Sequence, residues 1–317
     1  MPKQTLSNAD SNGDTTTPSA SNTSRAVLFM LGGSVLLTIN DALIKSLASG
    51  YPVGEVLFIR GAFVMPWIFM LAWHAGGMSS LLVRSFKGQV LRGVCVIASA
   101  FLFISGLTFL PLADAIAAAF TGPLFVTAMA PLVLGEKVGW RRWMAVGAGF
   151  IGVLFMVRPG SGALQLAILF PLFAAMFGGM RDLITRRISQ TESTVAVLFV
   201  TTAIVMTSGL FTAPFGWNAL RPGDIPYFAL SGFLLSGAHY ALIESFRLGE
   251  AAVVAPFKYS SLIWAILLGY LVFGDLPDGW TIMGASIVVG AGLYILHRET
   301  SLKKKKPVSA IGPTARM

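Results

Sequence analysis

Charged side chains interrupt the apolar segments of this chain, where each of them is costly. Asp41 and Lys45 occur late in the apolar run of residues 26–48. Because they are four residues apart, their charges lie on one face of a helix, one turn from each other. A charge at the centre of a bilayer costs about 2.5–3.5 kcal/mol on insertion scales. We therefore expect Asp41, Lys45 and the neighbouring Asn40 to face other protein or a water-filled cavity, either as a structural pair or as part of a binding or ion-coupling site.

This charge pattern occurs twice in the chain. Asp182, preceded by Arg181, follows Asp41 at an offset of 141 residues, and Arg186 follows Lys45 at the same offset. Further matches at similar offsets link Leu57-Phe58 with Leu198-Phe199, and Leu134-Gly135-Glu136 with Phe273-Gly274-Asp275. We infer that the chain contains one membrane unit in two copies, and that Arg181 and Asp182 are the second copy's candidates for substrate binding or coupling.

Two proline-containing interruptions fall at corresponding places of the two copies. Phe120-Thr121-Gly122-Pro123 interrupts one apolar segment near mid-depth, and Pro256-Phe257-Lys258-Tyr259 interrupts another. Proline removes a helical hydrogen bond and leaves backbone carbonyls free, and paired interruptions of this kind indicate a substrate site. Lys258 either lines this site or extends to the cytoplasmic face. Between the rings of Phe257 and Tyr259, its charge would suit a planar ligand with carbonyl acceptors, such as a flavin.

Three further polar residues lie within apolar segments. Arg60 is deep enough to need an anion, and Asp41 or Glu55 is the expected partner. His239 and Tyr240 occur together in a later segment. A single histidine inside a helix bundle is more commonly a hydrogen-bonded packing residue than a proton carrier, so both interpretations of His239 stay open here.

Composition indicates a membrane protein. Of the 317 residues, 55% are hydrophobic and 12% are charged, whereas a soluble domain carries about 25% charged residues. The net charge of +9 does not indicate nucleic-acid binding, because the basic residues lie between the apolar segments and after the last one, as membrane topology requires. Cys95, the one cysteine, cannot form an internal disulfide. No Cys or His cluster has metal-ligand spacing, so we expect neither a metal nor a cofactor.

Apolar segments of about 20 residues are typical of helices that span a bilayer. We predict an all-α membrane protein with ten spans, at residues 26–48, 53–74, 90–110, 112–134, 141–157, 163–181, 194–214, 225–247, 251–273 and 280–297. The two repeats would cover residues 26–158 and 163–298. Because five spans are an odd number, the second repeat would be inverted relative to the first. Inverted repeats are typical of secondary transporters, whose substrate binds between the halves.

Lys and Arg residues predict the orientation. If the N-terminus is cytoplasmic, only Arg158 and Arg221 among the basic residues outside the spans lie on the outer side, which is a strong positive-inside bias. Both termini are therefore expected in the cytoplasm. Lys45 then lies near the outer end of its span, and its ammonium could extend to the interface. Residues 1–24 are expected to be a disordered tail, and residues 299–317 a basic tail that contacts anionic lipid.

Several motifs resemble those of a known family. They are Ile39-Asn40-Asp41, Pro123-Leu124-Phe125 before Leu134-Gly135-Glu136, Asp182, and Ala255-Pro256-Phe257-Lys258-Tyr259 before the stretch Gly269–Asp278. Over residues 26–298 the chain resembles the drug/metabolite transporter superfamily in its EamA-type branch, and within it the bacterial riboflavin and S-adenosylmethionine uptake carriers. The family commonly has Glu where this chain has Asp275, which keeps the carboxylate. An arginine is common at the position of Arg60, which implies a structural or gating role.

The resemblance implies a multi-pass carrier of the bacterial inner membrane with no enzymatic activity. Its partner would be a small polar or planar metabolite, with riboflavin favoured over S-adenosylmethionine because Lys258 repels a sulfonium. No nucleotide-binding motif is present, so a proton gradient or exchange would supply energy. A membrane-embedded enzyme would need a constellation such as H-E-x-x-H, which the sequence lacks, and a scaffold gains little from buried charges. The direction of transport and the choice between monomer and homodimer stay open.

Overall fold

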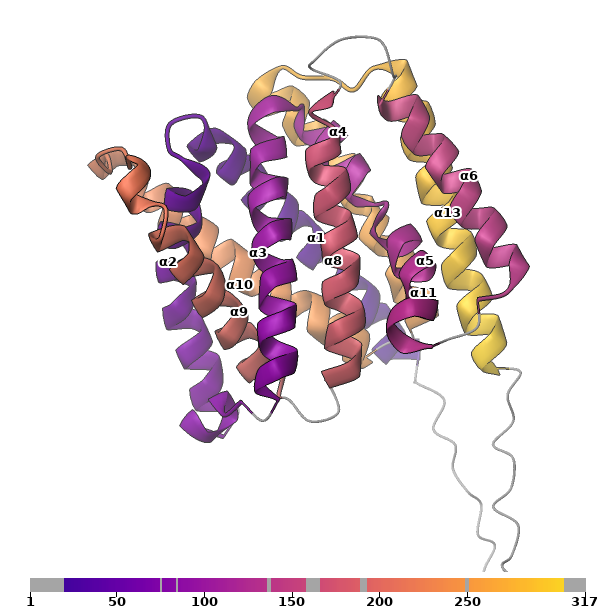
Figure 1. The fold of residues 1–317 in the computed structure, drawn as a ribbon, viewed down its shortest axis with the longest axis horizontal. Helices are drawn as coiled ribbons and strands as arrows, with labels where there is room; N and C mark the ends of the chain where they lie inside the picture. The colour runs from indigo at the N-terminus through magenta and orange to yellow at the C-terminus, as the bar shows by residue number, and fades with distance from the viewer. Residues whose placement is uncertain are drawn as a thin grey trace, which may run out of the picture.

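The computed structural model describes residues 20–74, 76–83, 85–135, 138–157, 166–188, 193–248 and 251–304. Every regular element in these ranges is helical (Figure 1), in agreement with the all-α class expected from the apolar segments. Glu136 and Arg158, which contribute to the sequence argument, lie outside the described residues.

The helices of the first half begin where proline ends the preceding segment. Pro52 precedes α2, and Pro111 precedes α4. Proline fixes its own φ and disfavours a helical conformation in the residue before it, so a helix starts there rather than continuing through. The described elements of this half are α1 (Ala20–Ala48), α2 (Val53–His74), η1 (Met78–Leu81), α3 (Phe86–Phe109), α4 (Leu112–Ala119), α5 (Gly122–Leu134) and α6 (Trp140–Val157).

The second half repeats this order with more short elements. Its described elements are α8 (Leu169–Ile188), α9 (Thr194–Leu210), η2 (Ala213–Phe215), η3 (Pro222–Asp224), α10 (Ile225–Leu248), α11 (Ala251–Val254), η4 (Ala255–Tyr259), α12 (Ser260–Leu268), η5 (Gly269–Phe273) and α13 (Gly279–Lys304). The predicted span 112–134 is divided into α4 and α5, and the predicted span 251–273 into α11, η4, α12 and η5.

Eight helices in the described part of the chain are long and apolar enough to cross a bilayer. They account for eight of the ten predicted spans. The other two predicted spans correspond to α8 and α10, which contain polar residues such as Arg181 and Asp182 in α8 and His239 in α10. Polar residues lower the mean hydropathy of a helix even when they face the interior of a bundle. The crossing of the bilayer by α8 and α10 stays a prediction.

Several helix ends differ from the predicted bounds. α1 begins at Ala20, so the last residues of the predicted N-terminal tail are helical. α13 continues to Lys304, into the predicted C-terminal tail, and α8 ends at Ile188 rather than at residue 181. Extending an existing helix costs far less than starting one, and basic residues are favourable in a last turn because of the helix dipole.

The two halves pack helix against helix. α1 packs against α10, and α3 packs against α8. α2 packs against α9, and α6 packs against α13. Each pair contains one helix from each half, and exchanging the halves converts the first pair into the second while leaving the other two pairs unchanged. The packing therefore has the internal two-fold relation that the duplicated sequence predicts.

Helices in equivalent positions of the two halves run antiparallel. Near the start of α2, Gly54 lies against Thr212, just after the end of α9. Near the end of α2, the ring centroid of Phe69 lies 5.8 Å from that of Phe199, which is close to the start of α9. The first turn of one helix thus meets the last turn of its counterpart.

α6 and α13 approach each other through glycine. A Cβ atom built on Gly152 would lie 2.8 Å from the carbonyl oxygen of Gly284, and one built on Gly284 would lie 2.5 Å from that of Gly152. Small residues let helices come this close in lipid. Phe155 and Trp280 stack beside this contact, with ring centroids 5.9 Å apart, so this pair is antiparallel as well.

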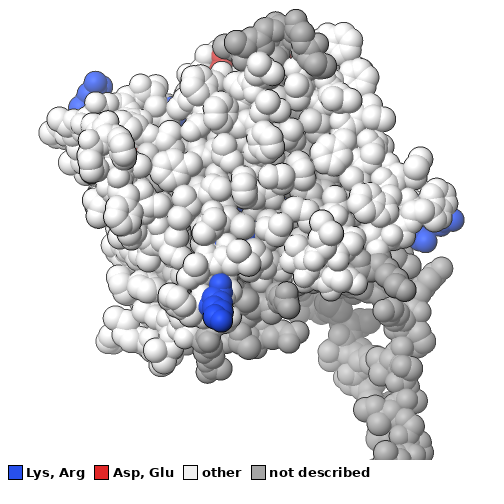
Figure 2. All heavy atoms as spheres, viewed as in Figure 1, with Lys and Arg blue, Asp and Glu red and all other residues white. Residues whose placement is uncertain are grey.

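The face of the molecule in Figure 2 carries almost no charge among the described residues. Large apolar side chains are widely exposed, including Leu132 and Phe215 at 87% and 88%. Exposed apolar surface on this scale marks a surface that meets lipid or protein rather than water. The charges that the sequence places inside the spans must therefore be sought within the bundle.

Candidate functional site

The first polar cluster joins α1, α2 and α10. Asn40 is fully buried. Its Nδ2 donates to Oδ1 of Asp41 at 3.2 Å, and its Oδ1 accepts from Ser231 Oγ at 2.7 Å. The carboxylate of Asp41 and the guanidinium of Arg60 attract each other electrostatically. Of the two partners that the sequence allows for Arg60, Asp41 is the one with this interaction, because Glu55 accepts instead from the backbone N–H of Asn218 at 3.0 Å.

The second cluster joins α8, α10 and η4. Arg181 Nε donates to Oδ1 of Asp182 at 2.9 Å, and the side chain of Asp182 is 58% exposed. Lys258 is exposed as a residue, and its charge is attracted by Asp182 and repelled by Arg181. The ring of His239 lies in the field of Arg60, Arg181 and Lys258 together. The duplicated motifs therefore bring their charges into one electrostatic network, and part of that network lies at the surface of the protein.

Tyr240 does not share the position of His239. Adjacent residues of an α-helix point about 100° apart, and Tyr240 is 50% exposed whereas His239 is partly buried. The sequence prediction treats the two as one candidate pair, but only His239 interacts with the network of charges.

Both helix interruptions occur where the prolines predict them, and they meet in space. α4 ends at Ala119 and α5 begins at Gly122, while η4 is a 3-10 segment between α11 and α12. The ring centroids of Phe120 and Tyr259 lie 4.7 Å apart, so one residue from each interruption contacts the other. Thr121 is fully buried, and its hydroxyl donates to the carbonyl of Ala118 at 2.7 Å. Its hydroxyl is thus occupied within the break itself.

Pro123 marks the start of a helix, and its role in ligand binding stays a prediction. It lies in the first turn of α5, where a proline leaves no hydrogen bond unmade because the first N–H groups of a helix lack partners anyway. Its carbonyl accepts from the hydroxyl of Thr127 at 2.9 Å.

The expected sandwich of Lys258 between two rings is not formed. In a 3-10 segment successive side chains point about 120° apart, so Phe257, Lys258 and Tyr259 point to three different sides. Tyr259 packs inward against Phe120. A Cβ atom built on Gly292 of α13 would lie 2.1 Å from the hydroxyl oxygen of Tyr259, so this hydroxyl points at α13. Phe257 is 38% exposed and Lys258 is exposed, so of the two rings only that of Phe257 is accessible beside the ammonium.

Lys45 connects the two halves at one end of the bundle. Its Nζ donates to the backbone carbonyl of Leu110, between α3 and α4. The same Nζ lies 3.5 Å from the carboxylate of Asp275, just after η5. It also lies 5.0 Å from the ring centroid of Phe273. These partners hold the ammonium of Lys45 within the protein at this end of the bundle, and its position relative to the bilayer surface stays a prediction.

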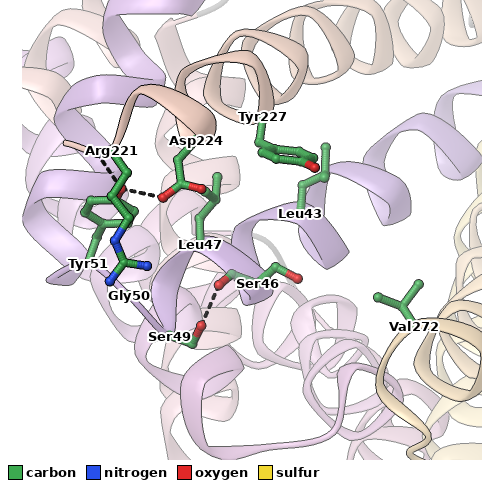
Figure 3. A pocket seen from close by; sticks show the side chains of 10 residues that line it. All are labelled: Leu43, Ser46, Leu47, Ser49, Gly50, Tyr51, Arg221, Asp224, Tyr227 and Val272. Carbon is green, nitrogen blue, oxygen red and sulfur yellow. Dashed lines mark hydrogen bonds between the residues drawn. The ribbon is translucent and has the colours of Figure 1, made fainter.

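A cavity of about 390 Å³ lies at the same end of α1 (Figure 3). Tyr51 lines it, and its hydroxyl donates to Oδ2 of Asp224 at 2.5 Å and accepts from the N–H of Arg221 at 3.1 Å. The hydrogen bond to this carboxylate raises the pKa of Tyr51 above its ordinary value of 10.0. Tyr227 and Val272 lie on its other sides. Sequence reasoning missed this cavity, because its lining residues come from three distant segments.

Arg92 and Gln89 are two further buried polar residues that sequence reasoning missed. Arg92 is 7% exposed and Gln89 is 2% exposed. Arg92 lies within the predicted span 90–110, close to its start. Its place in that apolar run was the available signal. Within the described residues, no group of three His, Cys, Asp or Glu side chains could hold a metal ion.

The chain matches a known family along both halves. The profile of the EamA-like transporter family aligns with residues 24–158 and again with residues 165–297. A solved crystal structure of another protein superposes with a TM-score of 0.58 at 17% identity and covers 89% of this chain and 99% of its own, which shows a common fold.

Curated relatives cover most of the chain. It is 27% identical to an S-adenosylmethionine uptake transporter of Rickettsia prowazekii over 88% of this chain and 95% of that protein. A riboflavin transporter of Rhizobium johnstonii is 33% identical over 64% of this chain and 68% of its own length. One of Vibrio cholerae is 27% identical over 89% and 96%. With both halves matched by one family profile and the fold in agreement, the chain belongs to the EamA-like transporter family, a family of membrane carriers rather than enzymes.

Proposed function

We propose that this transporter is a secondary carrier of the bacterial inner membrane, built from two inverted repeats with both termini in the cytoplasm. The antiparallel packing of α2 with α9 and of α6 with α13 supports the inversion. Equivalent helices that meet around a two-fold axis are parallel when the axis runs along them and antiparallel when it runs across them. An axis across the helices lies in the membrane plane, as in inverted-repeat transporters.

The substrate would bind between the halves, and access would alternate between the two sides. One observation supports this most directly. Lys45 joins both halves at the predicted outer end, through Leu110 and Asp275, while Asp182 and Lys258, toward the predicted inner end, are exposed. In this proposal the salt bridge of Lys45 holds the halves together at the outer end, and the exposed charges mark the route from the cytoplasm.

Energy would come from a proton gradient or from exchange. Asp41 and Asp182 are the candidate coupling groups, because each carboxylate lies in a long helix beside an arginine from the charge network. A proton that neutralises either carboxylate would release its arginine, and this would couple protonation to the packing of α1 or α8.

For the substrate we propose riboflavin, with S-adenosylmethionine as the second candidate. Relatives with either activity support this class. Lys258 and Arg181 place two positive charges at the exposed part of the network, which disfavours the sulfonium of S-adenosylmethionine. A neutral flavin offers carbonyl acceptors to Lys258 and a ring face to Phe257, which is 38% exposed. The carboxylate of S-adenosylmethionine is the specific feature that keeps it a candidate.

Uptake by whole cells tests this proposal. A riboflavin-auxotrophic bacterium without its own riboflavin carrier should grow on low external riboflavin when it expresses the chain. Asp182→Asn should reduce this growth at equal expression, whereas Arg141→Gln, at the exposed start of α6, should not. Rescue of a strain that depends on external S-adenosylmethionine, without rescue by riboflavin, would instead favour the second candidate. Rescue by neither compound would refute both substrates.

A further inference from the structure

Arg92 is a buried cation that no carboxylate neutralises directly. Its Nε donates to the hydroxyl oxygen of Thr185 in α8 at 2.8 Å, and its Nη1 donates to that of Thr201 in α9. Both hydroxyls are neutral, and both already donate their protons to backbone carbonyls of their own helices. In the described part of the chain, Arg92 forms no ion pair within 4.0 Å.

The surrounding charges leave this region positive. Asp182 attracts Arg92 through space, but its carboxylate is held by Arg181 with an N–O distance of 2.8 Å. Arg181 in turn repels Arg92. A guanidinium remains protonated in proteins. A buried charge is expensive when its only direct partners are neutral, so a bound anion here would lower that cost.

Gln89 supplies a second, independent indication of a ligand. It lies one turn before Arg92 on the same buried face of α3. It is 2% exposed, and neither its Oε1 nor its Nε2 has a hydrogen-bond partner among the described residues. Buried amides are almost always hydrogen-bonded. Two polar residues with unmet requirements thus lie three residues apart, where side chains on a helix can reach one group.

We propose that Arg92 and Gln89 bind an anion between α3, α8 and α9. The guanidinium retains donors on Nη2 and Gln89 offers two on Nε2, which suits chloride, phosphate or a carboxylate. The ligand is a small free ion or the anionic group of a transported molecule. As a free-ion site the inference is independent of the substrate, and as a substrate subsite it rests on the proposed transport function. Because α3 belongs to one half and α8 and α9 to the other, the anion would join the halves.

Thermal unfolding of the purified full chain in detergent tests the free-ion form. Choline chloride and the choline salt of inorganic phosphate are titrated into low-salt buffer. The wild type should show a saturable rise of the unfolding midpoint, as expected for a ligand that binds only the folded state. Arg92→Gln and Gln89→Leu should lose the saturable part. Arg141→Gln should keep it, because it removes one positive charge from the exposed start of α6 and therefore controls for a general salt effect.

Equilibrium dialysis with riboflavin and flavin mononucleotide tests the other source, because the two differ by one phosphate. If the anion belongs to a transported molecule, the wild type should bind the phosphorylated flavin about tenfold more tightly, and Gln89→Leu should reduce that ratio. Gln89→Leu replaces an unpartnered amide by an apolar group of similar size, so it can decide the question even if Arg92→Gln does not fold. Equal responses of wild type, control and both variants to all four compounds would overturn the proposal, whatever the uptake experiment shows.

Discussion

Replacing Lys45 by methionine should open the predicted outer side of the carrier. Methionine keeps most of the length and apolar volume of the lysine side chain, so the substitution removes the charge and its bonds with little change in packing. The bonds that are lost all cross between α1 and other segments, through Leu110, Phe273 and Asp275. Each of them exists only while these segments are together.

The contacts give the size of the effect. A hydrogen bond from a charged donor contributes about 1.5–3 kcal/mol. The ion pair with Asp275 is partly exposed, at 38% for the carboxylate side chain, and a pair of this kind contributes about 0–1 kcal/mol. The ring of Phe273 adds about 0.5–1 kcal/mol. A total of about 2–5 kcal/mol corresponds to a shift of about 30- to 5000-fold in the equilibrium between closed and open states.

Electron–electron distance measurements between spin labels can detect this shift. Labels at Ser49→Cys, just beyond α1, and Gly279→Cys, at the start of α13, would be introduced with Cys95→Ser. A Cβ at Gly279 meets no atom within 4 Å, so that label is accommodated. The unsubstituted pair should give one main distance. Lys45→Met should add a second, longer distance of comparable or greater population.

Two variants separate the contributions. Asp275→Asn removes only the ion pair, so it should shift the populations by less than about tenfold, the effect of roughly 1 kcal/mol. Lys45→Arg keeps the charge and should retain the closed distance as the main one. An unchanged distance distribution in Lys45→Met would refute the reasoning and reduce the bonds of Lys45 to ordinary packing.

The remaining predictions concern pH, helix packing and coupling. The raised pKa of Tyr51 means that its hydrogen bond contributes stability below pH 10, and that this contribution is lost as pH rises through the folded pKa. Tyr51→Phe should therefore have a lower Tm than the wild type at pH 8, and its Tm should fall less steeply with pH above pH 10. Parallel curves of Tm against pH for the two proteins would contradict this. Gly284→Ala should destabilise the protein by about 1–3 kcal/mol, because its Cβ would lie 2.5 Å from a backbone oxygen of α6. Gly147→Ala is the control, because its Cβ would meet no atom within 4 Å. In thermal denaturation it should be neutral or slightly stabilising. Asp41→Asn should impair uptake without loss of expression, and wild-type uptake across pH 5–8 would leave Asp41 as a packing residue.

The sequence was sufficient for features that depend on local pattern. Apolar runs of about 20 residues predicted most of the helices, because the bilayer sets a length that a helix must meet. The offset of 141 residues between Asp41 and Asp182 predicted two related halves, and the helix pairs have that relation. The proline-containing stretches at Pro123 and Pro256 predicted where helices are interrupted, because proline acts on its own turn.

Other features needed the tertiary structure. Arg60 could have paired with Asp41 or Glu55 by sequence, and only the packing of α2 beside the loop that contains Asn218 assigns Glu55 a different partner. The partners of Lys45 lie 65 and 230 positions further along the chain, and no periodicity predicts such contacts. The direction of Tyr259 depended on the 3-10 geometry of η4, which spreads neighbouring side chains around the axis.

Arg92 illustrates the limit most clearly. The sequence alone places this arginine near the start of the predicted span 90–110 and does not predict what its side chain contacts. The structure places it 7% exposed against α8 and α9, one turn from Gln89, whose amide has no hydrogen-bond partner among the described residues. Hydropathy is a property of one segment, so it predicts which segments enter the bilayer. Which side chain faces lipid, a neighbouring helix or a polar site is decided by how three separate segments pack, because burial and charge compensation are properties of that assembly.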